Sequence, residues 1–238
     1  MTSDSTQMPS LVHARLAGLL YLVIIFFGIS GELFIRSNLI VFGDADATVA
    51  KILTSDSLFR LGFVADSIML LCDVALAVLL FVLLKPVDRT LALIAMVFRL
   101  MQASILGMNL LNYFAAVLIL NGSVYVSAMD SAQLNAIALM FLDFHRYGYD
   151  LGLIFFAVSN FILGYLIVKA SYFPSLLGYG LVAAGMVYLC GSTARFVFPD
   201  SIAFIEPFYA IPLLAELAFC LWLLIKGIKF TENAVKAG

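Results

Sequence analysis

The sequence predicts an all-α fold, a polytopic membrane bundle of about six transmembrane helices, and three observations support this prediction. The chain of 238 residues is 64% hydrophobic and 12% charged. Its mean hydropathy of +1.10 leaves too little polar surface to cover a soluble globule. Long apolar stretches recur along the whole chain, and each approaches the roughly 20 residues that a helix needs to cross hydrocarbon.

Six segments can be placed from these stretches, and we expect them to form one integral membrane domain, 1–238, with disordered tails at 1–10 and 230–238. The first segment should remain in the mature protein, because its apolar run from Arg15 is long for a signal peptide and no A-x-A-like cleavage site precedes Glu32. The predicted segments are 11–31, 58–84, 90–120, 147–168, 175–196 and 207–228.

Two further stretches predict short interfacial helices at the outer face. The sequence Gly43-Asp-Ala-Asp-Ala-Thr48 is a turn and helix-capping signal, and Val49, Ile52 and Leu53 follow it at helical spacing. Residues 131–145 are amphipathic, and either lie on the membrane or run straight into the fourth segment.

Composition and motifs exclude several classes of function. The net charge of −2 and the scattered basic residues offer no surface for nucleic acid, so membrane lipid is the expected partner. The two histidines, His13 and His145, lie near opposite membrane faces, and no HExxH pattern occurs. We therefore predict no metal site, no haem held by both histidines and no cofactor. A serine hydrolase is disfavoured because Gly191-Ser192 has no G-x-S-x-G context.

Ionisable side chains inside the apolar segments are the strongest functional signal. Asp73, Arg99 and Glu216 lie twelve, ten and ten residues from Lys85, Arg89 and Lys226, at the ends of their segments. A rise of about 1.5 Å per residue places all three roughly 15–18 Å deep, near the bilayer centre. Such residues usually face the bundle interior and mark a binding site or an ion pathway. The candidates for this midplane cluster are Asp66, Asp73, Arg99, Gln102, Asn109, Asn160, Tyr188 and Glu216.

The short turn Lys85-Pro-Val-Asp-Arg89 predicts which of these side chains are neighbours. Antiparallel helices joined by a tight turn place residues at equal distance from it side by side. Asp73 should therefore lie next to Arg99, and Asp66 should lie level with Asn109.

Two interpretations of the cluster remain open. Polar groups can join helices without any other role, since such contacts are common and contribute about 0.6 kcal/mol on average. A binding site or proton relay is favoured by the charges, because a single Arg99 stands among three carboxyls, Asp66, Asp73 and Glu216. Glu216 either stands alone as a protonated acid or shares Arg99 as a partner. We expect a polar cavity between the second, third, fifth and sixth segments that opens toward the outer face.

A second group of polar residues lies at the predicted outer ends of the segments. We expect most of these side chains to be solvated, because Arg reaches the interface easily from a helix end. His145 could act as a base or a pH sensor there. The candidates are Glu32, Arg60, His145, Asp150 and Arg195. At the head of the fourth segment, Gly148 and Gly152 form a GxxxG pattern that predicts close helix packing or a homodimer.

A set of short motifs runs over most of the chain: Ala14-Arg-Leu-Ala-Gly-Leu-Leu-Tyr21, Gly43-Asp-Ala-Asp-Ala-Thr48, Phe59-Arg60, Phe98-Arg99, Gly152-Leu-Ile-Phe-Phe156, Gly164-Tyr-Leu-Ile167, Phe173-Pro174, Gly178 and Ala215-Glu-Leu-Ala-Phe-Cys-Leu-Trp-Leu-Leu-Ile-Lys-Gly227. With these motifs the sequence resembles one family, the bacterial multi-pass membrane proteins of domain of unknown function 4386. The resemblance implies a helical membrane protein and brings no activity, substrate or catalytic residue with it. The family's recurring Arg and Glu positions correspond to Arg60, Arg99 and Glu216.

Three functions are compatible with these features. The first is the binding or movement of a small or lipid-like ligand through the midplane cavity. The second is an intramembrane enzyme that uses Asp73 or Glu216 as acid or base while Arg99 holds an anionic group. The third is a structural or regulatory membrane subunit. We expect the protein to be located in the bacterial inner membrane.

The distribution of Lys and Arg predicts that both termini are cytoplasmic. Seven basic residues lie on the side of the termini and five on the other side, and basic residues favour the cytoplasm. A reporter fused in the turn Lys85–Arg89 should therefore read as cytoplasmic, and one fused near Asp44 should read as external. The reverse pattern would invert the orientation.

Overall fold

The computed structural model of this chain describes residues 10–122 and 129–228, and this part of the chain is helical without strands. It contains six helical units that are long and apolar enough to cross a membrane: Leu11–Leu39, Asp56–Leu84, Arg89–Leu120, Ser131–Lys169, Ser175–Val197 and Pro199–Ile225. The predicted fold class is thereby confirmed. The predicted disordered tails, 1–10 and 230–238, lie outside the described residues except for Ser10.

Shorter pieces make up these units. The first unit joins α1 (Leu11–Ser30), the π-helical turn η1 (Gly31–Arg36) and α2 (Ser37–Leu39). Then come α3 (Ala45–Thr54), α4 (Asp56–Leu84), α5 (Arg89–Leu120), α6 (Ser131–Lys169) and α7 (Ser175–Val197). The last unit joins η3 (Pro199–Ser201), α8 (Ile202–Ile205), η4 (Glu206–Tyr209) and α9 (Ala210–Ile225).

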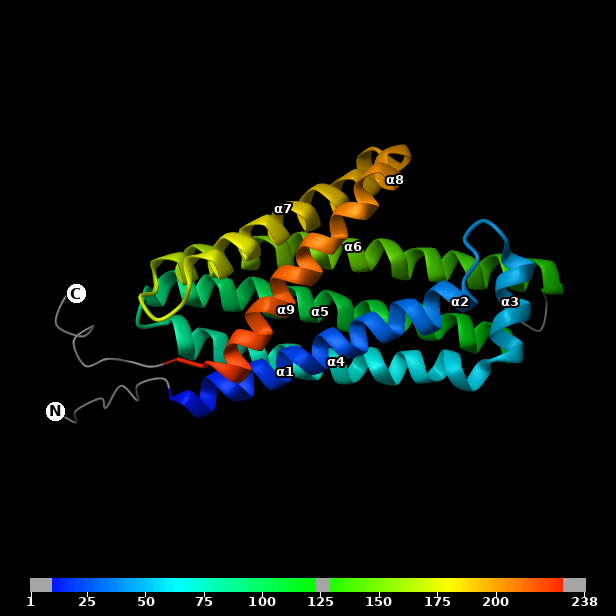
Figure 1. Cartoon of the computed structure of the whole chain (residues 1–238). Coiled ribbons are helices and arrows are strands. Elements are labelled where there is room, and N and C mark those ends of the chain that lie inside the picture. Colours follow the sequence, from blue (N-terminus) through cyan, green and yellow to red (C-terminus); the bar gives the residue numbers. More distant parts are fainter. Residues whose placement is uncertain (1–9, 123–128, 229–238) are drawn as a thin grey trace.

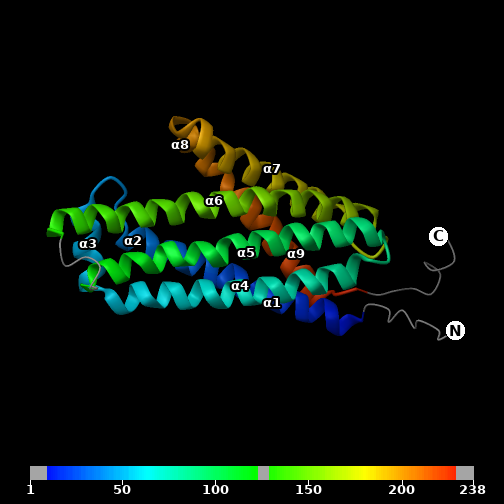
Figure 2. The same ribbon diagram turned by 180° about the vertical axis from the view of Figure 1, so that it is seen from behind.

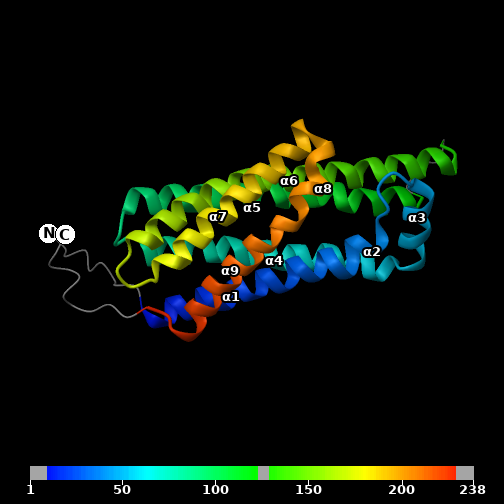
Figure 3. The same ribbon diagram turned by 45° about the horizontal axis from the view of Figure 1, so that its top comes forward.

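The helices run up and down, and both described ends of the chain lie at the same end of the bundle (Figure 1). The α4–α5 and α6–α7 turns lie at that end too, and we call it the terminal end. The α7–α9 hairpin is inclined to the other helices, and α8 at its tip lies short of the end of the bundle that carries α3. Figure 2 shows this inclination from behind, and Figure 3 shows it with the top of the molecule tilted forward.

Several helices begin where a side chain caps the free backbone N–H groups. Asp44 accepts from Ala47 N at the start of α3, and Asp88 accepts from Leu91 N at the start of α5. Asp130 and Gln133 form a capping box at the start of α6. The short helix predicted after residue 43 is confirmed as α3.

One predicted boundary was wrong, and of the two alternatives for residues 131–145 the continuous helix is confirmed. The first segment continues past residue 31 through η1 and α2 to Leu39. The amphipathic stretch 131–145 runs straight into the fourth segment, so α6 has 39 residues. Such a helix is about 58 Å long, whereas the hydrocarbon core is about 30 Å thick. Its first turns therefore extend beyond the span, where α3 packs against them through Ile52, Ala138 and Leu142.

At the terminal end, a dense apolar core fills the space between the helices. Its buried members include Ala14, Leu80, Leu166, Phe219 and Leu223.

Glycines set the closest helix contacts in this core. Gly18 of α1 lies against Leu224 of α9, and its carbonyl accepts from Cys220 Sγ at 3.3 Å. Gly164 and Gly178 bring α6 and α7 together at the level of the backbone.

The GxxxG pattern also acts within the chain. Gly148 faces Asn109 of α5, and Gly152 faces Leu106 of the same helix, so neither position has room for a Cβ atom. These glycines therefore serve the α5–α6 contact. A homodimer through Gly148 and Gly152 stays a prediction that this intramolecular contact does not support.

Even the smallest side chain at Gly178 should destabilise the protein. A Cβ atom there would lie 2.5 Å from the carbonyl oxygen of Gly164 and 2.9 Å from Val168 N, and neither backbone atom can rotate away. We expect Gly178→Ala to lower the free energy of unfolding by about 1–3 kcal/mol, as overpacking does in other cores.

Gly107→Ala is the matched control, because its Cβ atom would meet only Leu70, at 4.0 Å. That change should be neutral or stabilising by up to about 1 kcal/mol, since Ala favours a helix over Gly. Thermal unfolding of the detergent-solubilised variants measures both effects. Equal melting temperatures for the two variants would contradict the close α6–α7 contact.

Candidate functional site

A buried ion pair joins α4 and α5 at mid-span. Arg99 Nε donates to Asp73 Oδ1 at 2.7 Å, and Arg99 Nη2 lies 2.5 Å from the same oxygen. In the orientation that satisfies both of its polar atoms, the Gln102 amide also donates to Asp73 Oδ2 at 2.8 Å. The neighbours predicted from the short turn are therefore confirmed for this pair.

Aromatic rings flank the Arg99 guanidinium, which is only 1% exposed. Its central carbon lies 4.8 Å from the ring centre of Phe156 and 5.3 Å from that of Tyr21, distances typical of cation–π contacts. Its Nη1 atom has no hydrogen-bond partner among the described residues. The guanidinium is thus fixed by Asp73 and two rings, with one donor atom unused.

Glu216 of α9 reaches the same layer without a cationic partner. Asn160 Nδ2 of α6 donates to Glu216 Oε1 at 3.4 Å, and the Tyr188 hydroxyl of α7 lies close to the carboxyl group. No Lys, Arg or His of the described residues forms an ion pair with it. Of the two expected arrangements, the structure has the one in which Asp73 engages Arg99 and Glu216 stands apart.

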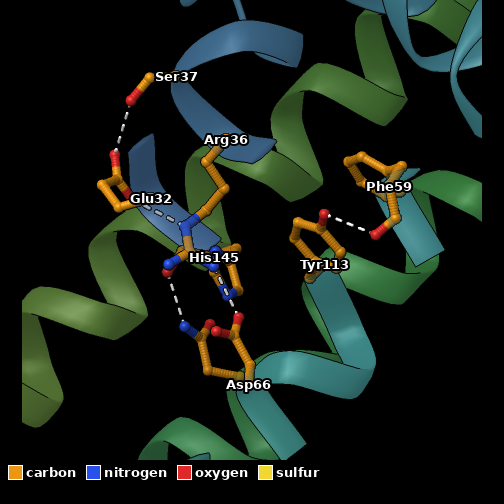
Figure 4. Close-up of polar contacts among 8 residues, drawn as sticks. Glu32, Arg36, Ser37, Phe59, Asp66, Tyr113 and His145 are labelled. Carbon is orange, nitrogen blue, oxygen red and sulfur yellow. Dashed lines mark hydrogen bonds and ion pairs between the residues drawn. The ribbon is translucent and has the colours of Figure 1, made fainter. Parts of the chain in front are cut away.

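Asp66 of α4 forms its ion pair with a residue outside the α4–α5 hairpin. Arg36 Nη1 donates to Asp66 Oδ2 at 2.7 Å, and Arg36 Nε donates to Glu32 Oε2 at 2.8 Å (Figure 4). Asn109 instead donates to the backbone oxygen of His145 at 2.6 Å. The expectation that Asp66 lies level with Asn109 stays a prediction, and these two side chains bond to Arg36 and to His145 rather than to each other. The count of a single arginine among three acids was wrong, because Arg36 pairs with Asp66.

The sequence did contain a signal for Arg36. Glu32 and Arg36 are four residues apart, as in an ion pair on a helix face. The predicted segment ends at residue 31, however, so Arg36 falls in the predicted loop. The π-helical turn carries the helix onward, and a Cβ atom at Gly31 would lie 3.2 Å from Arg36 Nη2. Glycine at this position leaves room for the guanidinium to reach Asp66.

The second group of candidates divides into solvated and buried residues. Arg60 pairs with Asp56 at 2.7 Å and is exposed, as predicted. His145 and Asp150 are each 5% exposed, so the expected solvation was wrong for them. The His145 ring lies 5.2 Å from that of Tyr113.

A second buried acid bridges α6 and α7. Asp150 forms an ion pair with Arg195, and Ser192 Oγ donates to Asp150 Oδ1 at 3.0 Å. This contact links the two helices near the end of α7 that lies away from the terminal end.

A hollow of about 390 Å³, which we call the chamber, lies among the spanning helices. Its walls come from all six spanning units. The expected cavity between the second, third, fifth and sixth segments left out two of them, because α1 and α6 contribute as well. The apolar lining residues are Ile24, Ile25, Gly28, Ile29, Leu33, Met69, Leu153, Phe156 and Leu213. The polar lining residues are Glu32, Asp73, Arg99, Gln102, Tyr149, Tyr188, Tyr209 and Glu216.

A second hollow of about 460 Å³, which we call the vestibule, adjoins the chamber on the side away from the terminal end. The two share Gly28, Glu32, Tyr149, Leu153 and Tyr209. The vestibule is more polar, and its charged lining residues are Glu32, Arg36, Arg146, Asp150, Arg195 and Glu206. The chamber and vestibule together form a path into the membrane span.

The path is closed at one end and open at the other. Between the chamber and the terminal end, the apolar core around Tyr21, Leu80 and Phe219 fills the bundle. At the other end, α9 diverges from α1 while α7 stays in contact with α6, and the vestibule lies there. Among the described residues, no group of three or more His, Cys, Asp or Glu side chains could hold a metal ion.

These features define a multi-pass helical membrane protein with a polar layer at mid-span. The family model described as "Domain of unknown function (DUF4386)" matches residues 16–227, and the chain therefore belongs to this family. An uncharacterised protein of Archaeoglobus fulgidus is 28% identical over 165 residues, which cover 69% of this chain and 83% of that protein. No solved structure matches.

The contrast between buried and exposed ion pairs gives a test of the mid-span layer. Asp73→Leu should lower the free energy of unfolding by about 3–5 kcal/mol, because it leaves Arg99 buried without its counter-charge. The double variant Asp73→Leu/Arg99→Met should recover most of this loss, since no charge then remains to be desolvated.

Asp56→Leu is the matched control, because its partner Arg60 is exposed and such pairs contribute about 0–1 kcal/mol. Equilibrium unfolding in mixed micelles compares the variants. A loss at Asp73 no larger than the loss at Asp56 would show that Arg99 can reach water or another partner.

Proposed function

We propose that this protein binds a small or lipid-like amphipathic ligand in the chamber. One observation carries the proposal: the chamber combines apolar walls with a polar floor formed by Asp73, Arg99 and Glu216. Sites for small molecules are typically apolar hollows with a few convergent polar groups, and they measure about 300–1,000 Å³. The chamber, at about 390 Å³, lies in this range.

The mouth of the chamber supports entry from the lipid as well as from water. Leu33 of η1 and Leu213 of α9 both line the chamber, yet they are 57% and 41% exposed. Exposed apolar side chains at that depth face hydrocarbon. α1 and α9 touch at Gly18 and Cys220 and separate toward the mouth. An acyl chain could enter between them, while a polar group could pass through the vestibule.

We further propose that the vestibule faces the outside of the bacterial inner membrane. The basic residues at the terminal end favour a cytoplasmic location for both termini. In that orientation the apolar core around Leu80 closes the chamber toward the cytoplasm. The arrangement favours a binding protein, or one outward-open state of a carrier.

An intramembrane enzyme is the second candidate. Asp73 is already held by Arg99 and Gln102, so Glu216 is the better acid or base. The third candidate, a structural or regulatory subunit, is supported by the Arg36–Asp66 and Arg99–Asp73 pairs, which join separate helices. The chamber beside these ion pairs is explained by the ligand proposal and is not explained by a purely structural role.

Filling the chamber should exclude the ligand without disturbing the fold. Gly28 lines the chamber, and a Cβ atom there would meet only Met69 Sδ, at an ordinary distance of 3.4 Å. We expect mass spectrometry of the gently extracted wild-type protein to detect a copurifying amphipathic molecule. Gly28→Leu should reduce its amount at least about tenfold, since the larger side chain occupies its space.

Gly107→Leu provides the matched control, because Gly107 is exposed, does not line the chamber and has open space around it. This variant should retain the molecule. Equal retention by both glycine variants would place any copurified lipid on the protein surface and would remove the support for a chamber ligand.

A further inference from the structure

The carboxyl groups around the path differ in their partners. Asp73 is paired with Arg99, and Glu32 is paired with Arg36. Glu216 is the remaining acid that lines the chamber, and it has no ion pair among the described residues. The floor of the chamber therefore holds one carboxyl group more than its basic side chains balance.

An unbalanced carboxyl group in the middle of a membrane span needs a counter-charge or a proton. Burying an ionised carboxylate without a partner is costly, because hydrocarbon does not replace its hydration. Asn160, at 3.4 Å, and the Tyr188 hydroxyl contact this carboxyl group as neutral donors, so neither supplies a counter-charge. A mobile ligand with a positive charge would supply the missing partner.

Aromatic rings surround the same floor. Phe156 lies 5.4 Å from Tyr188, and Tyr188 lies 6.0 Å from Tyr209, both measured between ring centres. All three side chains line the chamber, together with Tyr149. Ring faces attract organic cations, and the attraction is stronger where water is excluded.

The apolar walls of the chamber fit the apolar part of such a positively charged ligand. Ile25 and Ile29 of α1, Met69 of α4 and Leu153 of α6 line the chamber above the polar floor. These side chains offer no hydrogen bond, so they would accept an alkyl chain or a ring system rather than a polar moiety.

We propose that the chamber is a site for an amphipathic organic cation, an amine or quaternary ammonium compound whose charged head pairs with Glu216. This inference rests on the proposed function and names the ligand class. The rings of Tyr188 and Tyr209 surround the head, and the apolar body lies along α1 toward the mouth.

The positive charge of Arg99 does not remove the preference for a cationic ligand, because Asp73 already balances that charge at 2.5 Å. An anionic ligand could use the free Nη1 atom of Arg99, but it would then lie beside two carboxyl groups, Asp73 and Glu216. Like charges at such distances in a medium of low polarity repel strongly. The charge balance therefore favours a cation.

The end of the bundle that contains the vestibule carries more acidic than basic residues, nine against five, whereas the charged residues that line the vestibule itself balance at three of each. The surplus therefore lies outside the vestibule lining. A surplus of negative charge near the mouth of a cleft raises the local concentration of cations. The acidic residues are Glu32, Asp44, Asp46, Asp56, Asp130, Asp143, Asp150, Asp200 and Glu206, and the basic ones are Arg36, Lys51, Arg60, Arg146 and Arg195.

Three amphiphiles with the same nine-carbon chain test the proposal: nonyltrimethylammonium, nonan-1-ol and nonanoate. Calorimetric titration into full-length protein in nanodiscs, corrected with empty nanodiscs of the same lipid, gives the three affinities. We expect the cation to bind at least about tenfold more tightly than the alcohol and the anion, as a desolvated charge contact allows. This comparison uses only the wild-type protein.

Two carboxyl variants then locate the contact. Glu216→Gln should lower the affinity for the cation at least about tenfold and leave the affinity for the alcohol within about twofold. Glu206→Gln is the matched control, since Glu206 carries the same charge but is exposed in the vestibule. It should change the affinity for the cation by less than about threefold.

The possible results separate the two proposals. Tightest binding of nonanoate by the wild type would overturn the cation site while leaving a chamber ligand in place. Equal effects of Glu206→Gln and Glu216→Gln would also overturn it, because a general field would then explain the preference. Failure of all three amphiphiles to bind, together with no copurified molecule, would reject the chamber ligand itself.

Discussion

The rest of this structure depends on the pairing of Asp73 with Arg99 inside a membrane span. Hydrocarbon solvates neither charge, so each side chain is stabilised by the other, and their contact fixes the register in which α4 and α5 pack. The rings of Tyr21 and Phe156 then press α1 and α6 against the same guanidinium. One ion pair thus fixes the relative height of four helices.

The two ends of the bundle use this fixed layer differently. Toward the terminal end, small residues such as Gly18, Gly164 and Gly178 allow the backbones to approach, and the core is closed. Toward the other end, α9 diverges from α1, and polar contacts such as Asp150–Arg195 replace apolar packing. Close packing on one side and separation on the other are what leave a chamber at mid-span.

Polar groups that hold helices together and polar groups that serve a ligand are hard to distinguish in a membrane protein, because both must face the interior. Their partners make the distinction here. Arg36 pairs with Asp66 and Arg99 pairs with Asp73 across helices, which is sufficient for a structural role. Glu216 forms no ion pair among the described residues and lines a hollow, so the rule that explains the pairs does not explain Glu216.

The sequence by itself determined the class of fold, because hydropathy over about 20 residues reports the one property that hydrocarbon demands. It also determined the Asp73–Arg99 contact, since a five-residue turn leaves only one way to align α4 with α5. The contribution of Arg36 and the closed terminal end were decided by tertiary structure. Arg36 depends on a π-helical turn that has no clear composition signal. The chamber depends on how far α7 and α9 lean, which follows from contacts between residues distant in the sequence, such as Gly18 with Cys220 and Gly164 with Gly178.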